Sequence, residues 1–285
     1  MAKTAFITMD AESFFDTECV KGKTDVISEY TCKEQVGEFI KILDERGIKG
    51  TFFAVGEFFG DCKEYLISAV KNGHEIGVHA YSHLSPAKRT EEDFAKDLIK
   101  AKTLLEDELR VKIYGYRAPC FGISEKVAET VKKAGFLYDS SALNTAMGKR
   151  YPLKNYEKIS DAVYREKDGD FWEFKPVTAK FLGYDFPVCG GGYLRIAPWG
   201  LYKKLFDKKI KSGGDFLLYL HPFELYGGEF PKIKGVKAAE RYYLNAGRKD
   251  YKDKIIKILD ALIAAGYEFE TPCGYIKKHG GIVNV

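Results

Sequence analysis

The 285-residue sequence predicts an α/β fold built around a parallel sheet. The main observation is a repeated pattern, in which an amphipathic segment ends at a glycine and an apolar segment follows at once. The second observation is that the amphipathic segments carry their apolar residues at helical spacing. Strands that alternate with helices in this way favour a parallel sheet, as either a β/α barrel or a doubly wound sheet.

The strands are predicted from the glycines that precede them. The first strand is Ala5–Met9, close to the start of the chain. Glycine adopts the left-handed conformation that closes a helix, so each of the next junctions marks a helix end followed by a strand. These junctions lead into residues 48–55, 74–78, 136–139, 215–220 and 267–270. A further strand is predicted over residues 111–116.

Three helices are predicted from apolar residues that share one helical face. The faces consist of Val36, Phe39, Ile40 and Leu43, then Phe94, Leu98, Ala101 and Leu105, then Ile255, Ile258, Leu259 and Leu262. Thr90 precedes three acidic residues, which is typical of a capped helix start. We expect these faces to be core contacts.

The segment from about residue 140 to 193 is less regular than the rest. It contains Tyr151-Pro152, Asp168-Gly169-Asp170 and Gly190-Gly191-Gly192, and one strand is predicted around residues 171–174. We interpret it as an irregular insertion with loops near a functional site. No linker separates a second domain, so we expect residues 1–285 to form a single domain.

The composition is that of a globular protein and excludes several functions. The net charge is +4, from 45 Lys and Arg against 41 Asp and Glu, which is too small to indicate nucleic-acid binding. No segment has the features of a secretory signal or is long enough to span a bilayer, so we expect a cytoplasmic protein. The six cysteines lack C-x-x-C spacing, and in that compartment we expect free thiols. The oligomeric state is left open.

Polar side chains follow five of the predicted strands, and they predict a site. Asp10 and Glu12 follow the first strand, and four more strands end at His79, Arg117, Asp139 and His221. Active sites in parallel α/β folds are built where the strands end, so we expect these groups to meet. His83 lies four residues after His79, a spacing that lets two imidazoles converge on one ion.

Two histidines and one carboxylate, with a position left for water, are typical of a catalytic zinc site. Either Asp10 or Glu12 can supply the carboxylate, since they lie two residues apart and can face the same side. The other acid can then take a proton from a water that the ion activates. His221 is the natural group to protonate the leaving atom, because its charge changes near neutral pH.

Each of these residues also has a structural interpretation. Asp10 can cap a loop, Glu12 can be a solvated acid, and His221 can pack within a loop. Arg117 can form a structural ion pair, and a charge beside Asp10 would also keep that acid ionised. The histidine pair by itself is a moderate indication of a metal.

The motifs resemble those of the polysaccharide deacetylases, the carbohydrate esterase family 4 group that includes chitin and peptidoglycan deacetylases. Five segments resemble that family in order, at residues 8–12, 79–83, 116–119, 138–141 and 219–224. Each is weak alone, but their order and spacing are specific, and the resemblance covers residues 5–270. It implies a distorted (β/α)7 barrel and a divalent metal, either zinc or cobalt, nickel or manganese.

The first motif departs from the commoner pair of adjacent aspartates, because Ala11 stands between Asp10 and Glu12. In this respect the chain resembles a D-x-E branch associated with exopolysaccharide biosynthesis. That resemblance implies Asp10 as the base and Glu12, His79 and His83 as the metal ligands, although the departure leaves a swap of the two acids possible.

The resemblance implies hydrolysis of an N-acetyl group from an amino sugar, a glycan or its precursor. Arg117 would steady Asp10, Asp139 would orient Arg117 or His221, and a backbone N–H near Cys120 would hold the oxyanion. We expect substrate contacts from Cys120, Tyr81, Trp199 and Glu224, although any one aromatic ring is more often packed in the protein. The alternatives are hydrolysis of another amide, such as a ureide, a carbohydrate-binding homologue without catalysis, and a barrel with no metal.

Overall fold

The structure is a computed structural model that describes residues 3–143 and 153–280. Seven parallel strands form its centre, in the order β11-β1-β2-β3-β4-β5-β8, and a further strand, β12 (Tyr267–Phe269), pairs parallel with β1 beside this series. Their bounds are β1 (Lys3–Ala11), β2 (Thr51–Ala54), β3 (Glu75–Val78), β4 (Gly115–Tyr116), β5 (Tyr138–Asp139), β8 (Trp172–Phe174) and β11 (Phe216–Leu220). The α/β class is therefore confirmed, and the strand count and order are those of a distorted (β/α)7 barrel.

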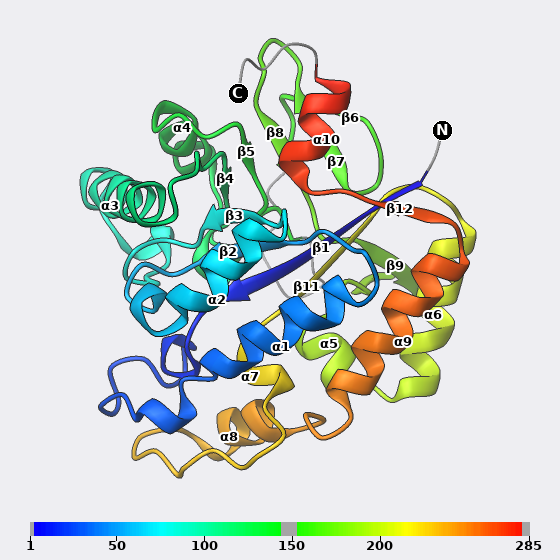
Figure 1. Cartoon of the computed structure of the whole chain (residues 1–285). Coiled ribbons are helices and arrows are strands. Elements are labelled where there is room, and N and C mark those ends of the chain that lie inside the picture. The colour runs from blue at the N-terminus through cyan, green and yellow to red at the C-terminus, as the bar shows by residue number, and fades with distance from the viewer. Residues whose placement is uncertain (1–2, 144–152, 281–285) are drawn as a thin grey trace.

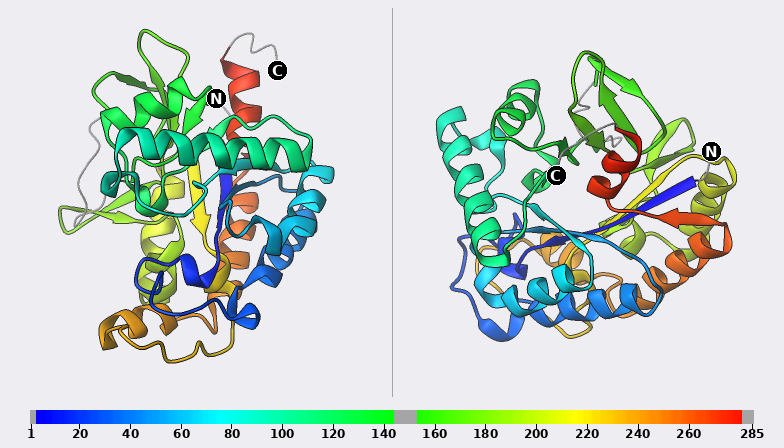
Figure 2. Two further views of the ribbon diagram at one scale, coloured as in Figure 1. Left: turned by 90° about the vertical axis from the view of Figure 1, so that its left-hand side faces the viewer. Right: turned by 45° about the horizontal axis from the view of Figure 1, so that its top comes forward.

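Helices surround the strands on the outside, as the right-hand view of Figure 2 shows. The longer ones are α1 (Lys33–Asp44), α2 (Phe59–Lys71), α3 (Glu91–Leu109), α4 (Glu125–Lys133), α6 (Trp199–Lys211) and α9 (Tyr251–Ala264). The apolar faces predicted for α1, α3 and α9 are all buried. None of the described helices combines the length and the apolar composition that crossing a bilayer requires.

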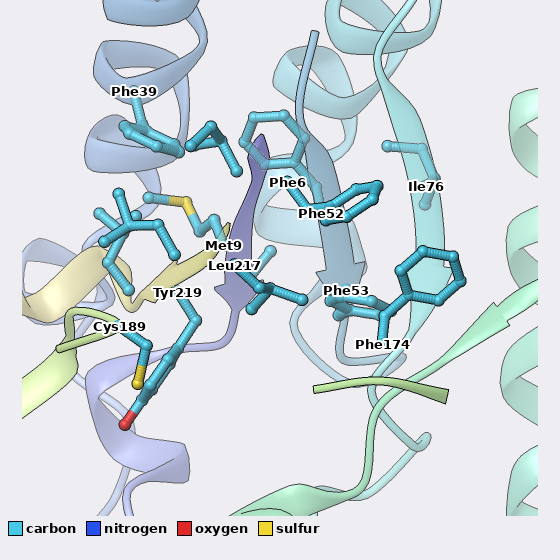
Figure 3. Packing of buried hydrophobic residues seen from close by; sticks show 14 of the residues in the cluster. Phe6, Met9, Phe39, Phe52, Phe53, Ile76, Phe174, Cys189, Leu217 and Tyr219 are labelled. Carbon is cyan, nitrogen blue, oxygen red and sulfur yellow. The ribbon is translucent and has the colours of Figure 1, made fainter. Parts of the chain in front are cut away.

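Buried aromatic and aliphatic side chains pack on both sides of the central strands (Figure 3). The ring of Phe6 on β1 lies 5.0 Å from that of Phe174 on β8, and Tyr138 on β5 lies 5.2 Å from Phe174. Each fully buried ring contributes roughly 1.5–3 kcal/mol by leaving water. Gly115 on β4 makes room for this packing, because a Cβ there would lie 2.1 Å from the Tyr138 hydroxyl.

The strand predicted around residues 171–174 is confirmed as β8, and it belongs to the barrel. All three of its residues are buried, and Trp172 and Glu173 pair with β5. The remainder does extend the barrel: β7 (Val163–Glu166) and β6 (Tyr156–Lys158) continue the sheet antiparallel, and β9 (Thr178–Phe181) and β10 (Tyr184–Pro187) form a separate hairpin. The segment Tyr151-Pro152, noted in the sequence, lies outside the described residues.

The strands end on the side of the molecule opposite to the two chain ends (Figure 1). Helices α7 (Pro222–Leu225) and α8 (Ala238–Asn245) lie at this end, together with the long loop that follows β1. Loop and helices share a second apolar cluster, separate from the barrel core, in which the ring of Phe14 stacks on that of Phe230 at 3.6 Å. The cluster consists of Phe14, Phe15, Val20, Cys32, Phe223, Phe230 and Leu244. It fixes the walls around the strand ends.

Candidate metal centre and active site

Three predicted ligands converge where β1 and β3 end. The carboxylate Oε2 of Glu12 lies 2.6 Å from Nε2 of His83 and 3.5 Å from Nε2 of His79. The two imidazole Nε2 atoms lie 3.3 Å apart, and all three ligand atoms fall within 4.8 Å of one another. The three residues are buried. One carboxylate oxygen and two ring nitrogens aimed at one point are a fitting donor set for a tetrahedral metal with one position left open.

A hydrogen bond at Nδ1, the ring nitrogen that points away from Glu12, fixes the orientation of His79. Its Nδ1 lies 2.8 Å from the backbone carbonyl oxygen of Arg117, which can only accept a hydrogen bond. The proton therefore lies on Nδ1, and the lone pair of Nε2 points toward Glu12 and His83. Metal-ligating histidines are commonly held in this way.

The charges around Glu12 keep it ionised. Burial by itself would raise the pKa of the carboxyl, but the positive charges of His83 and His221 hold that pKa well below its usual range. An ionised carboxylate is the form that binds a metal.

Asp10 lies beside this cluster and is held by Arg117, as predicted. Nη1 of Arg117 donates to Oδ1 of Asp10 at 2.6 Å and to Oγ1 of Thr8 at 2.9 Å. The rest of the guanidinium donates to the carbonyl and hydroxyl oxygens of Ser140. Both charged partners are buried, so the pair fixes the position of Asp10.

His221 approaches Asp10 from the neighbouring strand. Met9 pairs with Leu220 in the register of β1 and β11, so the residues that follow these two lie side by side. Nε2 of His221 lies 3.7 Å from Oδ2 of Asp10. The other ring nitrogen, Nδ1, lies 3.1 Å from Oε2 of Glu224.

The pKa of His221 is raised to about 9. Burial would lower it, but the negative charges of Glu12, Glu224 and Asp10, with the hydrogen bond to Glu224, outweigh burial. The ring therefore carries a proton at neutral pH and can donate it.

Glu224 belongs to this network and does not line the cavity, which corrects its prediction as a substrate contact. Its carboxylate is fully buried and accepts hydrogen bonds from Nε of Arg195 at 3.0 Å and from the Tyr251 hydroxyl at 3.1 Å. A backbone N–H of His221 also donates to it. Glu224 therefore orients His221.

Tyr81 and Trp199 do not line the cavity either, so their predicted substrate contacts are also corrected. The ring of Tyr81 lies under the ammonium group of Lys100, with Nζ 3.5 Å from the ring centroid. Trp199 lies at the start of α6, where its ring stacks on Tyr202. Both are aromatic residues near strand or helix ends, and the sequence gives no direction for their rings.

Asp139 does not bond to Arg117 or His221, contrary to the prediction. The hydroxyl of Ser141 donates to Asp139 at 2.5 Å, and the N–H of Ala118 donates to that hydroxyl at 2.8 Å. Burial raises the pKa of Asp139 to about 6, and Glu173 lies beside it. Asp139 thus supports the backbone next to Arg117 and has no contact with the reacting groups described here.

These groups open on a cavity of about 680 Å³. Asp10, His221 and the three candidate ligands line its floor, and Cys120 lines it as predicted. The cavity is also lined by Thr17, Glu18, Cys19, Phe121, Phe223, Ala239, Glu240, Tyr243 and Leu244. The walls thus come from the loop after β1 and from α8, two segments that the second apolar cluster joins.

Two residues that support the site, Arg195 and Asp97, were not predicted. Arg195 bonds to Glu224, and Asp97 bonds to residues 81 and 82. Each stands in an apolar context: Arg195 is a lone charge in the segment Tyr193–Pro198, and Asp97 lies between Phe94 and Ala101 on the apolar face of α3. A charge at such a position indicates a buried partner. That signal was available in the sequence.

Comparisons with known proteins give the family. Residues 3–138 match the polysaccharide deacetylase model, and residues 141–269 match a domain family of unknown function, DUF3473. A peptidoglycan deacetylase of Helicobacter pylori is 30% identical over 109 residues, which are 38% of this chain and 37% of that protein. A chitin deacetylase of Cryptococcus neoformans is 30% identical over 96 residues, 34% of this chain and 20% of that protein. The matched segments thus span less than two fifths of the length of either relative.

Solved structures share the fold. A Mycobacterium smegmatis protein provisionally described as a polysaccharide deacetylase has a TM-score of 0.66 at 20% identity, covering 98% of this chain and 90% of that one. A family 4 pseudoenzyme of Bacillus anthracis has a TM-score of 0.53 at 12% identity, covering 95% and 64%. Residues 3–138, just under half of the chain, thus match the polysaccharide deacetylase family, and the chain as a whole shares the fold of these solved structures.

Proposed function

We propose that the protein is a metal-dependent hydrolase that removes an N-acetyl group from an amino sugar or glycan. The observation that carries the proposal is the convergence, on one cavity, of three candidate ligands and a carboxylate–histidine pair. The similarity to named deacetylases supports this reaction class. The exopolysaccharide branch and the cytoplasmic location remain predictions from the sequence.

Glu12, His79 and His83 would hold the ion, and zinc suits their oxygen and nitrogen atoms, as do cobalt, nickel and manganese. When bound, such an ion polarises a carbonyl group and makes a water molecule more acidic. Nε2 of both histidines already faces Glu12, so little rearrangement is needed.

Two side chains would move the protons of the reaction. Asp10, held in place by its ion pair with Arg117, accepts a proton from the attacking water. His221, protonated because its pKa is about 9, donates one to the departing amine nitrogen. Nε2 of His221 lies 3.7 Å from Oδ2 of Asp10, so the proposed acid and base are neighbours. A backbone N–H near Cys120 would stabilise the oxyanion, since Cys120 lines the same cavity.

The direct test is acetate release before and after metal removal. We expect purified protein to bind about one zinc ion, and to release acetate from N-acetylglucosamine oligomers. Dialysis against a chelator should abolish the release, and added zinc or cobalt should restore it. A ureide and a simple N-acetyl amine are the matched substrates that separate a glycan deacetylase from a general amide hydrolase.

The outcomes separate the alternatives. Turnover of the ureide but not of the oligomers would replace the proposal with an amide hydrolase. Oligomer binding without acetate release, in protein loaded with zinc, would support a carbohydrate-binding homologue. That alternative has a structural precedent, because a family pseudoenzyme shares the fold. Protein that binds no divalent metal would rule out the proposed chemistry.

The pH dependence provides an independent prediction about His221. A general acid works while it is protonated, so activity should fall as pH rises through the pKa of His221. The charge of Glu224 raises that pKa. Glu224→Gln removes the charge and should therefore move the alkaline limb of kcat/KM toward lower pH, because kcat/KM reports the groups of the free enzyme.

Glu18→Gln is a suitable control for this profile. Glu18 lines the same cavity and is exposed, and its ion pair is with Lys88 at 2.6 Å. It makes the same change of charge without touching His221. An alkaline limb that stays in place in Glu224→Gln, in protein that still binds zinc, would assign that limb to a different group.

A further inference from the structure

The loop between the two candidate histidine ligands has an unfavourable backbone. Ala80 has a φ of 64° and His83 a φ of 50°, both in the left-handed region. Neither is glycine, and this conformation costs roughly 1–2 kcal/mol for an ordinary residue. Such a loop keeps its shape only if neighbouring groups hold it.

Asp97 on α3 provides that support through its carboxylate. Oδ2 accepts a hydrogen bond from the N–H of Tyr81 at 2.7 Å. Oδ1 accepts one from the hydroxyl of Ser82 at 2.6 Å and one from the N–H of Ser82 at 3.3 Å. Nη1 of Arg89 lies 2.7 Å from the same oxygen. Burial would raise the pKa of Asp97, but the bonds from Ser82, Arg89 and Tyr81 lower it, so the buried carboxylate stays charged.

The opposite side of the loop is held by the turn before α2. The N–H of Gly56 donates to the carbonyl of Ala80 at 3.1 Å, and the N–H of Glu57 donates to that of Tyr81 at 2.9 Å. A Cβ at Gly56 would lie 2.4 Å from the Tyr81 ring, so the two segments approach closely. The loop is therefore clamped between two backbone donors and the Asp97 carboxylate.

The two histidines differ in what holds them. His79 has the carbonyl of Arg117 behind its ring. Nδ1 of His83 is buried and has no hydrogen-bond partner among residues 3–143 and 153–280. The direction of the His83 ring therefore depends on the backbone that carries it, and Asp97 is the side chain that bonds to that backbone.

We propose that Asp97 is a positioning residue for the metal centre, which sets the direction of His83 by holding residues 81 and 82. The inference rests on the proposed metal site. Asp97 lies on α3, away from the cavity. It fixes the direction of His83, as the carbonyl of Arg117 fixes the direction of His79. Asp97 touches neither the candidate ligands' ring nitrogens nor the cavity.

The test measures zinc affinity with a competing chelator, in the full chain and without substrate. Asp97→Asn keeps the shape of the side chain but places an NH₂ group among donors. We expect zinc to bind about 10–100-fold more weakly, the range found when a partner behind a ligand is lost. Ser82→Ala removes one of the bonds and should weaken binding by a smaller factor.

Asp107→Asn is the matched control, since Asp107 is exposed on the same helix and the change of charge is identical. Its zinc affinity should equal that of the original protein. Thermal unfolding of the metal-free proteins measures the purely structural cost, and affinities are compared well below those temperatures. If Asp97→Asn does not fold, Ser82→Ala decides the question.

Two results would overturn the inference in different ways. Zinc affinity unchanged within about twofold in the folded variants would show that Asp97 does not position His83, and would leave the proposed function intact. Original protein that binds no zinc would remove the metal centre, and the proposed function would fail together with the inference. Weaker binding in Asp97→Asn and Ser82→Ala, but not in Asp107→Asn, supports it.

Discussion

His83→Ala is expected to abolish zinc binding and to reduce acetate release by about a thousandfold or more. The reason is that His83 is one of the three candidate ligands found among the described residues and makes the shortest contact within the cluster, 2.6 Å to Glu12. Loss of the ion removes several kcal/mol of transition-state stabilisation, and about 1.4 kcal/mol corresponds to tenfold in rate. Metal content and acetate release are measured on the same preparation.

The matched control is His279→Ala. His279 is in α10 (Pro272–His279), where its ring lies against Tyr275, and it does not line the catalytic cavity. This variant should keep its zinc and its activity. If His83→Ala retained one tightly bound zinc ion and most of its turnover, the three-ligand site would have been assigned wrongly.

The second large effect separates the roles of the two neighbouring acids. Glu12→Gln should lose zinc and activity together, whereas Asp10→Asn should keep zinc and lose about 10²–10⁴-fold in kcat, the range expected for a missing proton acceptor. The structure supports this assignment, because Glu12 contacts both histidines and Asp10 contacts Arg117 and His221. Zinc content and kcat, measured on both variants, decide the question.

The opposite pattern, in which Asp10→Asn loses zinc and Glu12→Gln keeps it, would mean that the acids exchange roles. Asp10→Asn also leaves the buried charge of Arg117 without its partner, and breaking a buried pair costs roughly 3–5 kcal/mol of stability. Unfolding temperatures must therefore accompany the rates. His221→Ala is a useful third variant, since it should lose turnover with its zinc retained and its activity should not recover with added metal.

The placement of the site followed from the sequence because it depends on chain order. Helix ends at glycine located most of the strands. Asp10 is the second-last residue of β1, and Glu12, His79 and His221 each follow a strand. Parallel strands bring their carboxyl ends to one end of the barrel, so convergence needs no knowledge of distances. Strand β8 was also predicted, but its three residues in an irregular segment gave no indication that it belongs to the barrel.

The directions of individual side chains could not be predicted in the same way. Glu224 lies three residues after His221, and only the turn of α7 points its carboxylate back to the imidazole. The ring of Tyr81 faces Lys100 because of the left-handed residue before it, Ala80. Asp139 bonds within its own segment, to Ser141. Such outcomes depend on local backbone angles and on which distant helix packs nearby.

The second apolar cluster separates two tasks that many enzymes combine. Chemistry is assigned to residues fixed by the barrel, whereas the outer walls are built from the loop after β1 and from α8, which have a core of their own. Substitutions in that outer core can therefore reshape the opening for a different glycan without disturbing the ion or the proton donors. We expect relatives of this chain to diversify their choice of sugar chiefly there, under selection that leaves the strand ends unchanged.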